Sequence, residues 1–198
     1  MKRILCLGDS NTFGHDPRSR IGEPYDDSQR WTGLLAGQDM AVINAGRNGQ
    51  CIYTPDEFSS LSGRFRSSMP LDAAVVMLGT NDLLRGAGAK EASARMERML
   101  RFLLGSEGMP LLILIAPPPM ELGEWVHTSE LIDRSRQLAE EYRTLAQVLG
   151  IPFADAGEWN VELAFDGVHF TPAGHAAFAA GLKTVLAREI PRREGDDE

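Results

Sequence analysis

The chain has 198 residues, of which 43% are hydrophobic and 24% are charged, an ordinary composition for a globular protein. The formal net charge of −8 argues against nucleic acid as a partner, because binding a polyanion needs clustered Lys and Arg. We expect a single domain over residues 1–190, a solvated and flexible tail over residues 191–198, and a neutral or weakly charged small molecule as the partner.

The amino-terminal segment predicts a strand rather than a targeting signal. Lys2 and Arg3 precede only four apolar residues, too few for the core of a signal peptide. No apolar run approaches the roughly 18 residues of a membrane span. Cys6 falls in this strand and Cys51 in a loop, so neither a disulfide framework nor a metal site is expected. These features favour a cytoplasmic protein that uses no membrane, metal or cofactor.

Short apolar runs rich in Val, Ile and Leu predict five strands that are covered on both faces, at residues 4–7, 41–43, 73–78, 111–115 and 151–154. Helical spacing of apolar residues separates the later runs and follows the last. This alternation predicts an α/β fold, a three-layer α/β/α sandwich with a five-stranded parallel sheet, joined by right-handed crossovers. We expect the flavodoxin-like strand order 2-1-3-4-5. The helical spacing is carried by Met96, Met99, Leu100 and Leu103, by Leu138, Tyr142, Leu145 and Leu149, and by Phe178, Leu182 and Val185.

Two sequence signals mark helix starts, and two loops are longer than a connection needs. Thr54, Pro55 and Glu57 form the pattern of a capping box, and Thr171 with Pro172 repeats the cap and first-turn proline. The loops 13–29 and 117–128 both follow the carboxyl ends of strands, where ligands bind in open α/β sheets.

Four polar segments follow the expected strands, at residues 8–10, 44–49, 79–82 and 166–169. If the first strand lies between the second and third, Ser10, Gly49 and Asn81 emerge side by side at one edge of the sheet. The last loop is long enough to carry Asp166 and His169 back over the same edge.

These residue types suit acyl transfer. A serine hydroxyl becomes a nucleophile when a histidine takes its proton, and a carboxylate fixes the tautomer of that histidine. Ser10 is therefore the predicted nucleophile, His169 the base and Asp166 the orienting acid. The Ser10 amide, the Gly49 amide and the Asn81 side chain are predicted to form an oxyanion hole.

Each segment also has a structural interpretation when taken alone. Gly, Asp and Ser suit any strand-to-helix turn, and residues 79–82 suit a helix N-cap. Residues 44–49 suit a tight turn, and Asp166 with His169 suits a surface turn or half of a metal site. Their joint occurrence after successive strands favours the hydrolase. The alternative from another class is a flavodoxin-like ligand-binding module, which the absence of a Gly- or Ser/Thr-rich phosphate loop argues against.

The four segments resemble those of the SGNH, or GDSL-type, esterases and lipases, and the resemblance covers the chain from Ser10 to His169. It implies the same roles for Ser10, Gly49, Asn81, Asp166 and His169. Asn11 stands where the family name has Leu. The run from Gly8 to Gly14 and the loop after it are most similar to the small arylesterase and acyltransferase branch, whose members are often oligomers. This resemblance implies a homo-oligomer, with the loop 13–29 as a candidate contact.

The other histidines and the apolar loop residues have weaker patterns. We expect His15 and His127 to be loop residues, His175 to pack on the last helix, and Asp9 to support the turn before Ser10. For the apolar residues, core packing or loop anchoring is the default interpretation, and for three of them a substrate pocket is a hypothesis. The residues considered are Phe13, Met120, Trp125 and Trp159, of which the first three are the candidates for substrate binding.

Together these features predict a serine carboxylic ester hydrolase that acts on short-chain esters, with possible acyl transfer to alcohols or peroxide. A carbohydrate O-deacetylase with the same catalytic groups is the alternative within the resemblance.

Overall fold

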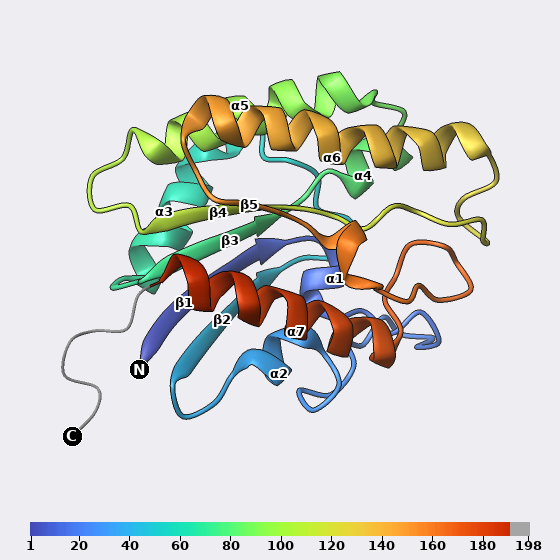
Figure 1. Ribbon diagram of the computed structural model, residues 1–198, viewed down its shortest axis with the longest axis horizontal. Helices are drawn as coiled ribbons and strands as arrows, with labels where there is room; N and C mark the ends of the chain where they lie inside the picture. The colour runs from blue at the N-terminus through green and yellow to red at the C-terminus, as the bar shows by residue number, and fades with distance from the viewer. Residues whose placement is uncertain (191–198) are drawn as a thin grey trace.

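A computed structural model describes residues 1–190 of the chain; the predicted tail at 191–198 lies outside the described residues. Five parallel strands form one central sheet with helices on both faces (Figure 1). The α/β sandwich predicted from the alternating pattern is therefore confirmed. The strands are β1 (Lys2–Gly8), β2 (Met40–Gly46), β3 (Ala73–Met77), β4 (Leu111–Ala116) and β5 (Phe153–Asp155).

The strand order is β2-β1-β3-β4-β5, as predicted, and all neighbouring pairs are parallel. Gly8, at the end of β1, is in register with Gly46 on one side and with Met77 on the other. The segments that leave β1, β2 and β3 therefore start next to one another.

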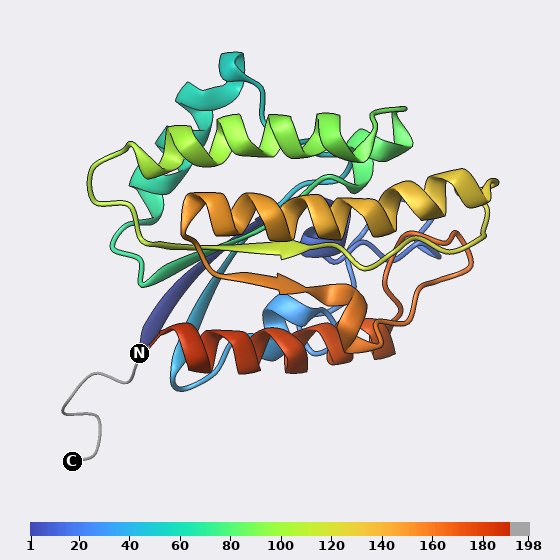
Figure 2. The ribbon, with the colours of Figure 1, turned by 45° about the horizontal axis from the view of Figure 1, so that its top comes forward.

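The helices divide between the two faces of the sheet (Figure 2). On one face, α2 packs against α7, and its Trp31 lies in the same apolar cluster as Phe178 of α7. On the other face, α5 packs against α6, with α3 and α4 beside them. The bounds are α1 (Ser10–Phe13), α2 (Trp31–Leu35), α3 (Phe58–Ser68), α4 (Thr80–Leu84), α5 (Ala89–Leu104), α6 (Ser129–Leu149) and α7 (Pro172–Glu189), with short 3₁₀ helices at Pro55–Glu57 and Ala156–Trp159.

The strand boundaries differ from the prediction by one residue at β3 and β4, and by more at β1, which covers Lys2–Gly8 rather than 4–7, and at β2 and β5. β2 runs from Met40 to Gly46, longer than the predicted 41–43, because it pairs along its whole length with β1. β5 starts at Phe153 rather than 151, because Ile151 takes part in the cap that follows α6. There Gly150 is in the left-handed conformation and the Ile151 N–H donates to the Ala146 carbonyl. Ile151, whose apolar side chain suggested a strand, is therefore part of the C-terminal cap of the helix.

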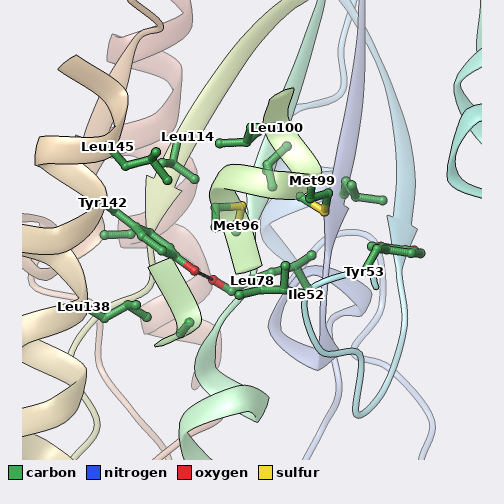
Figure 3. Packing of buried hydrophobic residues seen from close by; sticks show 14 of the residues in the cluster. Ile52, Tyr53, Leu78, Met96, Met99, Leu100, Leu114, Leu138, Tyr142 and Leu145 are labelled. Atoms are coloured by element: carbon green, nitrogen blue, oxygen red, sulfur yellow. Dashed lines mark hydrogen bonds between the residues drawn. The ribbon is translucent and has the colours of Figure 1, made fainter. Parts of the chain in front are cut away.

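Tyr142 of α6 fixes the turn that follows β3. Its ring is fully buried in the core, and its hydroxyl donates to the Leu78 carbonyl at 3.0 Å (Figure 3). Gly79, the next residue, has a φ of 122°, and a Cβ at that position would lie 2.7 Å from the Tyr142 hydroxyl. Only glycine fits both the backbone conformation and the space. The core thereby sets where α4 begins.

The predicted helix caps are present. The Thr54 N–H and hydroxyl both donate to the Glu57 carboxylate, and the Thr171 hydroxyl accepts from the Gly174 N–H. Both cysteines are free thiols. Within residues 1–190, no helix is long and apolar enough to cross a membrane.

Candidate active site

Ser10 lies at the turn from β1 into α1. The side chain of Asp9 caps this helix by accepting from the Asn11 N–H at 3.0 Å, which confirms the expected support of the turn. Gly8 leaves no room for a side chain, because a Cβ there would lie 2.0 Å from the Thr12 hydroxyl oxygen. Burial raises the pKa of Asp9 to about 6, although the hydrogen bond from Asn11 lowers it. The serine therefore sits on a tight turn whose conformation is set by its two preceding residues.

Asp166 and His169 continue a chain of hydrogen bonds from Ser10. His169 Nε2 lies 2.9 Å from Ser10 Oγ, and His169 Nδ1 lies 2.6 Å from Asp166 Oδ2. The other carboxylate oxygen of Asp166 accepts from the backbone N–H groups of Val168 and His169, each at 2.9 Å. Burial would raise the pKa of Asp166, but the hydrogen bonds from His169 and Val168 lower it below its usual value. The carboxylate is thus held in its charged form against the imidazole.

Asn11 connects the loop of His169 to the serine turn. Its side-chain nitrogen donates to the Val168 carbonyl at 3.0 Å, and its side-chain oxygen accepts from the Phe170 N–H at 3.0 Å. The Asn11 carbonyl accepts from the Trp31 indole N–H at 2.9 Å. Both the nitrogen and the oxygen of the side-chain amide therefore form hydrogen bonds, with the two residues that flank His169.

The candidate oxyanion donors follow β1, β2 and β3. Within residues 1–190, the backbone N–H groups of Ser10 and Gly49 donate no hydrogen bond. Gly49 has a φ of 70°, and its carbonyl accepts from Arg85 at 3.1 Å. The Asn81 side chain donates to the Gln50 carbonyl at 3.1 Å, which uses one of its two N–H groups. Three N–H donors are therefore available at this edge of the sheet.

Residues of α4 and its C-cap residue Arg85 hold the segment that carries Gly49. Besides the bonds from Asn81 and Arg85, the Asp82 carboxylate accepts from the Ile52 N–H at 2.9 Å. Asp82 is fully buried and forms an ion pair with Arg95 at 2.8 Å. These contacts fix the loop after β2 against the loop after β3.

Two aromatic side chains contact the imidazole of His169. The centroid of the His15 ring lies 4.6 Å from the centroid of the imidazole, and the centroid of the Trp125 ring lies 4.9 Å from it in an edge-on arrangement. Burial and the neighbouring His169 both lower the pKa of His15. The lowered pKa favours the neutral form of His15 beside His169. Its place on a loop was predicted, but its contact with His169 has no signal in the sequence.

The other candidate residues lie in different surroundings. Trp125 is half exposed, Phe13 is partly buried at the end of α1, and Met120 is buried in the core. Trp159 packs its ring on Phe178, in accordance with the packing interpretation. A cavity of about 580 Å³ lies next to the Gly49 segment and α4, and none of Phe13, Met120 and Trp125 lines it. Its lining includes Arg85, Arg95 and Arg98.

His175 and His127 have the surroundings expected of them. His175 is fully buried on α7, and its Nδ1 accepts from the Trp31 N–H at 3.4 Å. Burial lowers the pKa of His175 to about 4, so it packs as a neutral ring. His127 is exposed on its loop. Among the described residues, no group of three or more His, Cys, Asp or Glu side chains is placed to hold a metal ion.

A serine, a histidine and a buried carboxylate joined in this order, at the carboxyl edge of a doubly wound sheet, define the class of serine hydrolases. The family model for the GDSL-like Lipase/Acylhydrolase family matches residues 6–177, and the chain belongs to this family.

Proteins similar to this chain are esterases. An arylesterase from Vibrio mimicus is 26% identical over 200 residues, covering 96% of this chain and 90% of the relative. An aryl esterase structure from M. smegmatis has a TM-score of 0.83 and 30% identity, over 96% of this chain and 100% of that chain. A carbohydrate acetylesterase family member from Sinorhizobium meliloti has a TM-score of 0.81 and 28% identity, over 95% and 98%. The chain is a carboxylic ester hydrolase of the SGNH type, which excludes the binding module without chemistry.

Proposed function

We propose that this enzyme hydrolyses small carboxylic esters through a covalent acyl-enzyme at Ser10. The observation that carries the proposal is the continuous chain from Ser10 Oγ through His169 to Asp166, with contacts of 2.9 Å and 2.6 Å. Both distances are within hydrogen-bond reach, as proton transfer from a nucleophile to its base requires.

In the proposed mechanism, Ser10 Oγ attacks the ester carbonyl carbon while His169 Nε2 takes the serine proton. The carbonyl oxygen becomes negative and accepts hydrogen bonds from Ser10 N–H, Gly49 N–H and the free N–H of Asn81. Collapse of this intermediate breaks the bond to the alcohol, whose oxygen takes the proton from His169. A water molecule then attacks the acyl-enzyme by the same steps, which releases the acid and restores Ser10. The mechanism requires no metal or cofactor.

A fluorophosphonate probe tests the nucleophile directly. We expect the probe to label Ser10 stoichiometrically and to abolish hydrolysis of p-nitrophenyl acetate, because phosphonylation needs an activated serine. Mass spectrometry of the digested protein identifies the labelled residue. Labelling at another serine, or full activity after complete labelling of Ser10, would refute the proposal.

The surroundings of His169 support a preference for short acyl chains. The Trp125 ring lies against the imidazole and is half exposed, so it occupies space that a long acyl chain would need. We expect Trp125→Ala to shift the preferred p-nitrophenyl ester from acetate toward butyrate and hexanoate, and Phe13→Ala to shift it in the same direction. Rates are measured across the ester series. An unchanged chain-length profile in both variants would contradict this pocket; Trp159→Ala, which alters a packing residue, is the control.

Two finer activities belong to the same proposal. The likeness to a carbohydrate acetylesterase favours an acetylated sugar as a second candidate substrate. Alcohols or peroxide would compete with water for the acyl-enzyme if the pocket excludes water. An ester panel that varies the acyl and alcohol parts separately, with and without added acceptor, distinguishes these activities.

Cytoplasmic localisation and assembly into a homo-oligomer stay predictions. Sedimentation of the purified chain tests the assembly.

A further inference from the structure

We infer that Asn11 is a positioning residue that fixes the imidazole of His169 relative to Ser10, an inference that rests on the proposed function. One planar amide binds the backbone on both sides of His169, at the Val168 carbonyl and at the Phe170 N–H, each at 3.0 Å. Asn11 directly follows Ser10 in the chain. The nucleophile and the carrier of its base are therefore tied together through one side chain.

The hydrogen bonds of the His169 loop show how much depends on this amide. Within residues 1–190, the turn of Ser10 is joined to the loop 156–171 by three hydrogen bonds: the two of the Asn11 side chain and the one between Ser10 and His169. Among the described residues, the other hydrogen bonds that leave this loop run to the loop 117–128, through Glu121, Glu124 and Trp125, and also to Asp155 just before the loop, to Arg143 of α6 and to the first turn of α7. These bonds hold Asp166 and its neighbours, but they do not fix the loop relative to Ser10.

Asn11 is itself firmly held. Its side chain is buried, its N–H donates to the Asp9 carboxylate, and its carbonyl accepts from Trp31, whose ring is also buried. With its backbone held at both ends, the amide has little freedom to follow a displaced His169 loop. The link between the two segments is accordingly rigid.

The chemistry of the link is specific to an amide. The Val168 carbonyl needs a donor and the Phe170 N–H needs an acceptor, and the asparagine side chain offers both. Leucine has the same branched shape but is larger and can neither donate nor accept. Aspartate matches asparagine in size and keeps the acceptor for Phe170, but it turns an oxygen toward the Val168 carbonyl. Asn11→Asp therefore removes one bond without a change in size, whereas Asn11→Leu removes both bonds.

The first test is kinetic, in Asn11→Leu and Asn11→Asp. We expect kcat for p-nitrophenyl acetate to fall about tenfold to a hundredfold in both, with KM changing less than threefold, because a misplaced base slows chemistry more than binding. Thr12→Val is the matched control, since Thr12 is the next buried residue and its hydroxyl has no hydrogen-bond partner among residues 1–190. Unchanged kcat in both Asn11 variants would overturn the inference.

A double substitution distinguishes positioning of His169 from general support of the turn. In a His169→Ala background, Asn11→Asp should reduce the residual activity less than twofold, because the imidazole that it positions is absent. An undiminished tenfold loss in that background would show that Asn11 acts on the turn or the oxyanion donors instead. Using Asn11→Asp for this comparison keeps the test available if Asn11→Leu does not fold.

A spectroscopic readout separates this inference from the proposed function. The Nδ1 proton of His169, in a 2.6 Å hydrogen bond to Asp166, should give a downfield proton NMR signal. We expect this signal to shift upfield or broaden in both Asn11 variants and to persist in Thr12→Val. An identical signal in all four proteins would overturn the inference even if Ser10 proves to be the nucleophile. Failure of the proposed function would instead appear as full activity in Ser10→Ala, whatever the signal does.

Discussion

Replacement of Ser10 by alanine is expected to lower the rate of p-nitrophenyl acetate hydrolysis by about 10,000-fold or more, since no acyl-enzyme can form. The substitution removes one oxygen from a buried turn, and the backbone N–H groups proposed to bind the oxyanion remain. We therefore expect the thermal unfolding midpoint to change little, so that the loss of rate reports chemistry. Initial rates and unfolding are measured on the same preparations.

Ser28→Ala is the matched control for this experiment. Ser28 is an exposed serine of the loop 13–29. Its variant should retain the wild-type rate and the labelling by a fluorophosphonate probe, whereas Ser10→Ala should lose both. A residual rate in Ser10→Ala close to that of wild type would refute the assignment of the nucleophile.

Asp166→Asn is expected to reduce kcat by roughly 1,000-fold to 10,000-fold with little change in KM. The remaining side-chain oxygen still accepts from the Val168 and His169 N–H groups, so the loop keeps its shape. The new NH₂ group faces His169 Nδ1 and can only donate, which forces the imidazole to carry its proton on Nε2. In that tautomer Nε2 cannot take the proton of Ser10.

The control for Asp166→Asn is Asp133→Asn, on the exposed side of α6, where the carboxylate pairs with Arg136. Steady-state kinetics of both variants at neutral pH test whether Asp166 orients His169. A loss of less than tenfold in Asp166→Asn would mean that another group orients His169.

The sequence predicted the architecture and the contact of distant residues because both depend on periodic or topological signals. Runs of apolar residues marked the strands, and the order 2-1-3-4-5 then placed the segments after β1, β2 and β3 together. The pairing of Ser10 with His169, 159 residues apart, followed from a loop long enough to return over the sheet.

Features that depend on side-chain packing had no such signal. Three such features arise from loop conformations: the two hydrogen bonds from the Asn11 side chain to the residues on either side of His169, the contact of the His15 ring with His169, and the hydrogen bond from Arg85 to Gly49. Loop backbones are set by tertiary contacts rather than by a local pattern. The same reason applies to the cavity beside α4, and to Met120, whose burial in the core depends on how its loop is packed.

The separation of 159 residues between Ser10 and His169 has a consequence for how activity is acquired during folding. Contacts between such distant segments close a large loop, and the entropy of that closure opposes them until the intervening sheet is formed. A partly folded chain in which β1 to β4 have assembled would hold the proposed nucleophile and the proposed oxyanion donors without the proposed base, His169. Ester hydrolysis should consequently return only with the last stage of refolding, which makes turnover a direct indicator of the completed native state.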